Sequence, residues 1–146
     1  MYTIVTRIEI AATPERVWTT LTDFPSYPRW NPFIRTISGT FRKGQSLRVV
    51  LALPGRKAMT VHPKVLVAEE EREFRWRGRL VIPGLFDGEH YFRIESLGPS
   101  QTRLTHGEDF SGILAGTLLS RMRDPVRDAF MAMNRALKER AEKAAN

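Results

Sequence analysis

The sequence predicts an α+β fold in which an antiparallel sheet packs against one long C-terminal helix. Three observations support this prediction. Residues 2–10 alternate in polarity and are rich in β-branched side chains, as half-buried strands are. Several further strand-like segments follow, with only short breaks between them. From about residue 114, apolar side chains recur every three or four positions, which is the period of an amphipathic helix.

The region after the first strand predicts a short helix. Thr13 is a favoured N-cap residue, and Pro14 suits the first helical position. The apolar side chains that follow share one helical face: Val17, Trp18 and Leu21. The helix must end near Asp23, because the segment 24–34 contains three prolines, which a helix interior does not tolerate.

Six strand-like segments come next, separated by turn-forming residues such as Pro54-Gly55 and Gly98-Pro99-Ser100. Because the connections are short, consecutive segments are expected to pair as an antiparallel meander. The segments are 33–40, 46–54, 58–68, 72–81, 86–97 and 102–110.

The long helix is expected to cover the sheet, since it is the only large apolar partner available. Pro125 lies inside its pattern and should kink it, because proline removes one backbone hydrogen bond. Alternatively, Asp124 and Pro125 are the N-cap and first residue of a second helix. The apolar face is expected to be core and comprises Leu114, Leu118, Met122, Val126, Phe130, Met133 and Leu137.

Alternation in the last hairpin predicts its register. If Leu97 lies opposite Gln101, every opposed pair of residue numbers sums to the same value, and the apolar side chains of both strands share one face. That register places Ile94 opposite Leu104, Phe92 opposite His106 and His90 opposite Glu108. The inward face is therefore apolar but carries three ionisable groups: His90, His106 and Glu108.

The preceding strand is expected to point aromatic rings inward, at Phe74 and Trp76. Its arginines have the opposite parity and should form ion pairs on the solvated face: Arg75, Arg77 and Arg79, with Glu89 or Glu95. His62 precedes a proline and is expected at the surface.

Composition excludes several classes of protein. The chain has no cysteine, so disulfides and thiolate catalysis are ruled out. The net charge is +7, but the basic residues are spread along the chain among acidic ones, so we expect no nucleic-acid partner. No segment has the apolar length of a membrane span or of a signal peptide. We therefore expect a cytoplasmic protein without integral membrane association.

Longer stretches resemble a known superfamily. The opening IEIAATPERVWTTLTDFPSYPRWNPFI resembles START-like (SRPBCC) proteins, the polyketide cyclase/dehydrase and lipid-transport group. The later stretches GEHYF, TRLTHGEDFSGIL and AMNRALKERAE resemble a bacterial branch of it. The resemblance covers nearly the whole chain and implies one START-like domain over residues 1–146. It implies a helix-grip fold, in which a seven-stranded curved antiparallel sheet wraps around the long C-terminal helix. Two short helices would lie between the first two strands.

A deep, mostly apolar cavity between sheet and helix is part of the fold that the resemblance implies. The segment FPSYPRWNPFI (24–34) would end the helix pair beside this cavity, and its prolines would hold aromatic rings in place at small entropic cost. Phe24 is expected to belong to the core. Trp30 and Phe33 belong either to the core or to the cavity wall.

The inward ionisable groups allow three kinds of chemistry. A buried histidine beside a carboxylate can act as a general base, but such a pair also satisfies itself or anchors the polar end of a ligand. Two histidines and a glutamate are also a conceivable zinc site, yet no motif such as HExxH is present, and we expect no metal. Nucleotide-binding and serine-hydrolase motifs are absent, so neither class is expected.

We therefore expect a carrier or sensor that binds a small hydrophobic molecule, such as a lipid, a polyketide-like or an aromatic compound, without a cofactor. The alternative is an aromatase/cyclase-like enzyme with a cavity histidine as general base, for which the catalytic candidates are His90, His106 and Glu108. A third possibility is a partner-regulated module whose cavity is filled. The protein is expected to be a monomer or homodimer. The expected ligand-binding residues are Trp30, Phe33, Trp76, His90, Phe92, His106, Glu108, Phe110, Leu118 and Met122.

Overall fold

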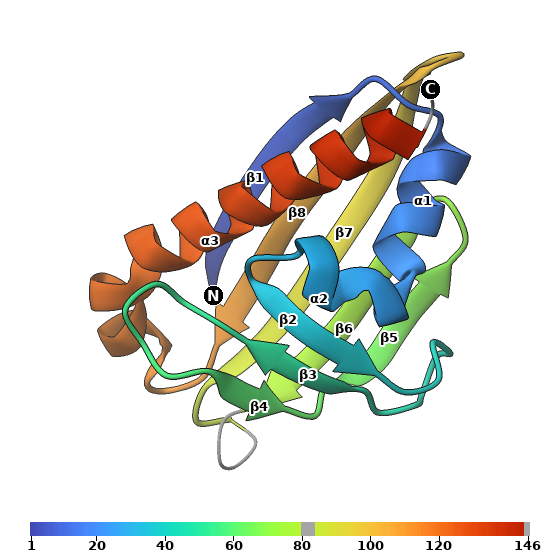
Figure 1. The fold of residues 1–146 in the computed structure, drawn as a ribbon. Helices are drawn as coiled ribbons and strands as arrows, with labels where there is room; N and C mark the ends of the chain where they lie inside the picture. Colours follow the sequence, from blue (N-terminus) through green and yellow to red (C-terminus); the bar gives the residue numbers. More distant parts are fainter. Residues whose placement is uncertain (80–83, 145–146) are drawn as a thin grey trace.

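An antiparallel sheet wraps around one long helix in the computed structural model, which describes residues 1–79 and 84–144 (Figure 1). After β1 (Tyr2–Ile10) come α1 (Pro14–Thr22), a 3-10 turn η1 (Phe24–Ser26) and α2 (Tyr27–Trp30). The remaining elements are β2 (Ile34–Ser38), β3 (Arg48–Leu51), β4 (Met59–Val61), β5 (Lys64–Glu69), β6 (Glu73–Arg79), β7 (Asp87–Gly98), β8 (Gln101–Ser111) and α3 (Ala115–Ala144). The α+β helix-grip prediction is thus confirmed, including the short helices between the first two strands.

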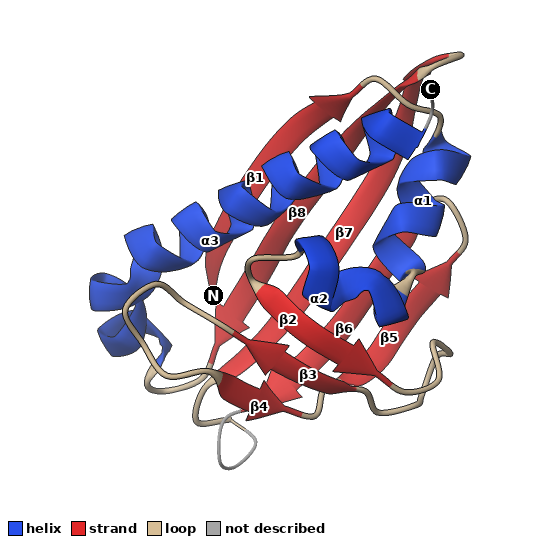
Figure 2. Cartoon of the chain, viewed as in Figure 1, coloured by secondary structure: helices blue, strands red, loops and turns tan. Residues whose placement is uncertain are grey.

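The described strands form two hydrogen-bonded sheets, which Figure 2 shows in red against the blue helices. The larger has the order β1-β8-β7-β6-β5, and the smaller has the order β2-β3-β4. A bridge between Ser46 and Lys64 joins them, supported by backbone hydrogen bonds between residues 44–47 and 63–65. The joined sheets form a curved wall, and α3 lies across its concave side.

The strand count differs from the expected seven because the predicted segment 58–68 is two strands. β4 pairs with β3, whereas β5 pairs with β6, so the two halves belong to different sheets. The break falls at His62 and Pro63. Pro63 has no N–H to continue a ladder, and its carbonyl instead accepts a hydrogen bond from Leu47. His62 is exposed, as predicted.

The register of the last hairpin is confirmed. Ile94 pairs with Leu104, Phe92 with His106 and His90 with Glu108. It differs only at the turn, where an irregularity after Ser96 places Gly98, and not Leu97, opposite Gln101. The alternation of apolar and polar residues over eleven positions fixed this register more strongly than the turn did.

The outer face of the sheet carries an ion-pair network around Arg75. Its guanidinium contacts Glu73, Glu89 and Asp109, and it also stacks 4.5 Å over the ring of Tyr91. The expected pairing with Glu89 is therefore present for Arg75 and Arg77. It is wrong for Arg79, which makes no ion pair among the described residues and lines the cavity described below. Glu95 contacts an arginine of β8 instead, and the last two positions of the predicted strand 72–81 lie outside the described residues.

Helix α3 runs through Pro125 without splitting, so the expectation of a second helix starting there is wrong. Its second half packs tightly, and Phe130, Met133 and Leu137 are fully buried. The first half is covered less completely. Ala115 and Leu119 are buried, but Leu118 and Met122 are only half-buried, and Leu114, expected in the core, precedes the helix and is 39% exposed. The helix therefore packs closely along its second half and leaves space beneath part of its first half.

Candidate functional site

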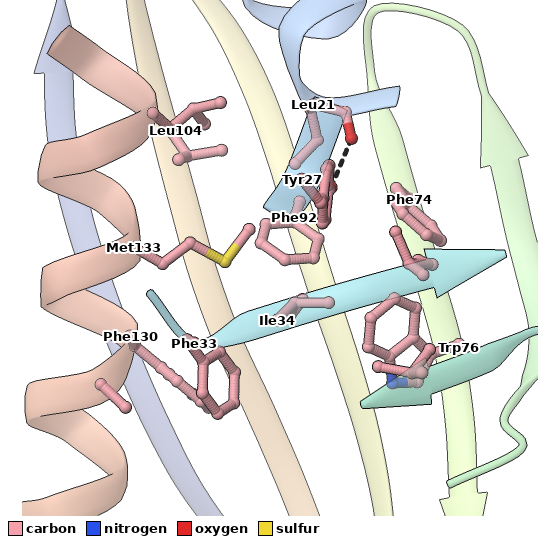
Figure 3. Close-up of a cluster of buried hydrophobic side chains, with 14 of the residues drawn as sticks. Leu21, Tyr27, Phe33, Ile34, Phe74, Trp76, Phe92, Leu104, Phe130 and Met133 are labelled. Atoms are coloured by element: carbon pink, nitrogen blue, oxygen red, sulfur yellow. Dashed lines mark hydrogen bonds between the residues drawn. The ribbon is translucent and has the colours of Figure 1, made fainter. Parts of the chain in front are cut away.

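A cavity of about 520 Å³ lies under the first half of α3. Its wall comes from the inner faces of the two sheets and from the helix, and most of it is apolar. Cavities of this size and character are typical of small-molecule sites. Figure 3 shows three of the wall residues, Phe33, Trp76 and Phe130. The lining residues are Phe33, Leu51, Leu53, Arg56, Lys57, Met59, Val61, Trp76, Gly78, Arg79, Phe86, Gly88, His90, Glu108, Phe110, Leu118, Leu119, Met122, Val126 and Phe130.

Glu108 and His90 form the polar patch in this apolar wall. Both line the cavity, and Oε1 of Glu108 lies 2.9 Å from Nδ1 of His90. The other oxygen, Oε2, has no hydrogen-bond partner among the described residues. It lies over Gly88, where a Cβ atom would collide with it. Glycine at position 88 therefore makes room for the carboxyl group.

A chain of hydrogen bonds runs from this pair into the protein interior. Nε2 of His90 lies 2.7 Å from Nε2 of His106, and Nδ1 of His106 lies 2.8 Å from Oδ1 of Asn134 on α3. Nδ2 of Asn134 donates to Oγ1 of Thr6 on β1, which in turn donates to the carbonyl of His106. Thr6, His90, His106 and Asn134 are all buried. The chain thus links the cavity to both the first strand and the last helix.

The direction of every hydrogen bond in this chain follows from its inner end. Thr6 gives its only hydroxyl hydrogen to a carbonyl, so its oxygen must accept from the amide of Asn134. Oδ1 of Asn134 then faces His106, whose Nδ1 must carry the hydrogen. Neutral His106 accepts at Nε2, so His90 donates from its own Nε2. Nδ1 of neutral His90 is therefore bare, and Glu108 must be protonated to bond to it.

Burial shifts the pKa values in the same direction. Burial raises the pKa of Glu108 from 4.5 to about 8, and the nearby charge of Asp109 adds to the rise. Burial lowers the pKa of His90 from 6.5 to about 3. Burial also lowers the pKa of His106 well below 6.5, reinforced by His90 and opposed by the hydrogen bond to Asn134. At neutral pH the site is thus an uncharged carboxylic acid beside two uncharged imidazoles.

Aromatic rings cause much of this desolvation. The ring of Trp76 stacks on His90 with centroids 5.1 Å apart, and Phe130 stacks on His106 at 4.3 Å. Phe33 lies against Phe130 at 5.4 Å and so closes the wall between β2 and α3 (Figure 3). The rings exclude water from the imidazoles, which makes their charged forms costly.

Seven of the ten expected ligand-binding residues line the cavity, and three do not. His106 and Phe92 are fully buried behind the wall, where they contact each other at 4.3 Å. Trp30 turns the other way and lines a separate hollow of about 720 Å³ between α1, α2 and α3. That hollow is lined mostly by charged and polar side chains. The seven that line the cavity are Phe33, Trp76, His90, Glu108, Phe110, Leu118 and Met122.

The aromatic segment 24–34 divides its rings between two roles. Phe24 and Tyr27 are buried in the core, and the hydroxyl of Tyr27 donates to the carbonyl of Leu21 (Figure 3). Oδ1 of Asn31 accepts from the backbone N–H groups of residues 33 and 34. These two hydrogen bonds direct the chain into β2 and present Phe33 to the cavity. The core prediction for Phe24 is confirmed.

Sequence reasoning missed two groups of residues at the site. Thr6 and Asn134, which set the direction of the hydrogen-bond chain, were not candidates. A polar residue within the apolar face of the helix was the available signal for Asn134, four positions after Phe130. The second group is a set of cations that line the cavity: Arg56, Lys57 and Arg79.

The donor geometry does not fit the zinc alternative. Nε2 of His90 and Nε2 of His106 point at each other across 2.7 Å, which is a hydrogen-bond distance and leaves no room for an ion between them. In the described part of the chain, no three acidic or histidine side chains are grouped as metal ligands.

The comparison with known proteins agrees with this architecture. The sequence profile of the polyketide cyclase/dehydrase and lipid transport family matches residues 1–144. The chain belongs to this family. Family members bind small hydrophobic molecules, which suits the cavity. No curated protein matches the chain, and no helix among the described residues is long and apolar enough to cross a bilayer.

Solved structures of other proteins share the fold at low sequence identity. The Zhui aromatase/cyclase from Streptomyces sp. R1128 superposes with a TM-score of 0.80 at 18% identity, over 99% of this chain and 96% of the other. A START superfamily protein from Mycobacterium smegmatis has a TM-score of 0.74 at 21% identity, over 97% and 98%. A norcoclaurine synthase point mutant from Thalictrum flavum has a TM-score of 0.75 at 13% identity, over 99% and 96%.

Proposed function

We propose that the protein is a carrier or sensor that binds a small hydrophobic molecule with one uncharged polar group in the cavity under α3. The observation that carries this proposal is the apolar cavity with one carboxyl oxygen, Oε2 of Glu108, left without a partner among the described residues. The protonated carboxyl already engages His90, so Oε2 is placed to accept a hydrogen bond from a hydroxyl or amide on the ligand.

The wall favours a rigid or ring-containing ligand. Aromatic rings from both sheets and from α3 face the space, and half-buried side chains of α3 cover it. Met122 is flexible and adapts its shape to what it contacts. Such a site gains most of its affinity from apolar area and its orientation from the polar patch.

A matched pair of tryptophan variants on α3 tests this proposal. Met122→Trp places a bulky ring in the cavity, whereas Met131→Trp places the same ring on the exposed face of the helix, where Met131 is 36% exposed. We expect Met122→Trp to weaken binding of the uncharged fluorescent probe phenylnaphthylamine by about tenfold or more, because filling the space removes contact area. Met131→Trp should bind like the wild type.

Probe fluorescence measures the affinities, and circular dichroism checks that both variants fold. Native mass spectrometry of freshly purified protein would add the identity of a co-purified compound. Failure of the wild type to bind phenylnaphthylamine, or equal losses in both variants, would contradict the proposal.

A second candidate function is acid–base catalysis, favoured by the position of Glu108. Both ring nitrogens of His90 are already in hydrogen bonds, and His106 does not reach the cavity. The general base would therefore be Glu108 rather than a histidine, with His90, His106 and Asn134 as positioning residues. The similar aromatase/cyclase structure adds support for this candidate.

A β-hydroxy ketone is the simplest substrate for such a group. The Glu108 carboxylate would remove the proton beside the carbonyl, the carbon–oxygen bond would break, and the same proton would leave with the hydroxide as water. We expect the rate of dehydration of the benzaldehyde–acetone aldol adduct to rise as the pH approaches about 8, where Glu108 ionises. Ultraviolet absorbance of the conjugated product measures the rate.

Glu108→Gln should lower this rate by about a hundredfold or more, the usual contribution of a general base, while phenylnaphthylamine still binds. A dehydration rate that does not depend on pH, or that is unchanged in Glu108→Gln, would contradict the catalytic function without affecting the proposed binding function.

A further inference from the structure

Three exposed cations line the outer part of the cavity. Arg56 and Lys57 lie in the connection between β3 and β4, and Arg79 ends β6. All three are exposed, and none makes an ion pair within the part of the chain that the structure describes. The acidic residue nearest to Arg79 in register is Asp87, whose carboxylate instead accepts from the N–H of Gly84.

Four arginines on the outer face of the larger sheet do have acidic partners. On the outer face, Arg75, Arg77, Arg93 and Arg103 each contact at least one carboxylate. Other exposed arginines of the described strands, such as Arg35 and Arg48, also make no ion pair, so what sets Arg56, Lys57 and Arg79 apart is their place beside the apolar cavity. Among the described residues Glu108 is the only acidic one that lines the cavity, and in its protonated form it offers these cations no negative charge.

Unpaired like charges beside an apolar space are unfavourable unless an anion joins them. Their repulsion is weakened by water, but a low-dielectric wall focuses their field into the cavity mouth. A wholly uncharged ligand would gain nothing from this field. A ligand with an anionic group at the mouth would gain from all three cations.

We infer that the ligand is an elongated hydrophobic anion. Its apolar body would fill the cavity, an uncharged polar group would reach Glu108, and a carboxylate, sulfonate or phosphate would lie at the mouth beside Arg56, Lys57 and Arg79. This inference rests on the proposed binding function and names the chemical class of its ligand. Arginine and lysine both bind such groups, and arginine does so through paired hydrogen bonds.

Two probes that differ in one group test the inference. Phenylnaphthylamine and anilinonaphthalene sulfonate share the same ring system, and only the second carries a negative charge. We expect the wild type to bind the sulfonate about tenfold more tightly at low salt, since three nearby cations favour it. Added sodium chloride should weaken binding of the sulfonate and leave binding of the uncharged probe unchanged, because salt screens exposed charges.

A triple variant and its matched control test whether the preference for the sulfonate comes from the three cations at the cavity mouth. The variant combines Arg56→Gln, Lys57→Gln and Arg79→Gln, and should lose the preference for the sulfonate while binding the uncharged probe as before. The control removes the same residue types at exposed positions that do not line the cavity, Arg42, Lys43 and Arg72, and should keep the preference.

The outcomes separate the two proposals. The inference of an anionic ligand would be overturned if the wild type bound both probes equally well. It would also be overturned if the preference for the sulfonate survived in the triple variant or disappeared in the control. Failure of the wild type to bind the uncharged probe would instead contradict the proposed binding function itself.

Discussion

Glu108→Gln is expected to make the protein more stable than the wild type at alkaline pH. The pKa of Glu108 is 4.5 in an unfolded chain and about 8 in the folded protein. Between these values the folded state holds a proton that the unfolded state has released, so the wild type loses stability as the pH rises. The slope is about 1.4 kcal/mol for each pH unit and each proton. Glutamine does not titrate, and its amide can donate to Nδ1 of His90 as the protonated acid does.

His90 and His106 affect the acid side of the dependence of stability on pH. Their folded pKa values lie below 6.5, so the unfolded chain binds protons first, and stability falls as the pH drops below 6.5. Both proteins share this acid limb. From pH 6.5 to about 8 the stabilities of the wild type and of Glu108→Gln should therefore differ in slope only through Glu108.

Urea denaturation at a series of pH values provides the measurement. In that interval the free energy of unfolding of the wild type should decline relative to that of Glu108→Gln. Parallel curves for the two proteins would show that Glu108 is already ionised in the folded state. A partly buried acid that lowers stability at neutral pH is the kind of group that functional sites retain.

Asn134→Leu is expected to reverse the hydrogen-bond chain and to lower the pKa of Glu108. Without the Asn134 oxygen, His106 no longer needs a hydrogen on Nδ1 and can carry it on Nε2. His106 then donates to His90, His90 donates from Nδ1 to Glu108, and the carboxylate becomes the favoured form. Stability should fall by about 1–3 kcal/mol, because Thr6 and His106 each lose a buried partner.

Nuclear magnetic resonance reads both effects in one sample. Imidazole nitrogen shifts report which nitrogen carries the hydrogen, and the side-chain carboxyl shift of Glu108 reports its pKa. Thr102→Val is the matched control, because it also removes a buried side-chain hydrogen bond, to the carbonyl of Ala12, but one that lies outside this chain. It should keep the wild-type tautomers, and a Glu108 pKa that is the same in Asn134→Leu and the wild type would refute the reversal.

The positions of the three polar groups on the sheet could be predicted from the sequence. Alternation is a local property of a strand, and the correct register of His90, His106 and Glu108 follows from it. How deeply these side chains are buried could not be predicted from the sequence. Whether an inward side chain reaches the cavity or lies behind its wall depends on where α3 crosses the sheet, and that is a long-range property. Phe92 and His106 were therefore expected in the wall but lie behind it.

Helical periodicity predicted the face of α3 correctly but not its distance from the sheet. Leu118 and Phe130 fit the same repeat, yet only Phe130 is fully buried. A three-to-four-residue period says which side chains point the same way and nothing about what they meet. Trp30 illustrates the same limit, since its segment was expected near the cavity and its ring faces the opposite hollow.

The bonds between β1 and α3 have a consequence for biosynthesis. Besides the bond between Asn134 and Thr6, Lys138 donates to the carbonyl of Glu9, and Glu142 accepts from the N–H of Ala11. The ribosome makes β1 first and α3 only after every strand. A nascent chain therefore has no complete binding site, and its apolar sheet face stays uncovered until translation of the helix is finished, which makes that chain a natural client for chaperones.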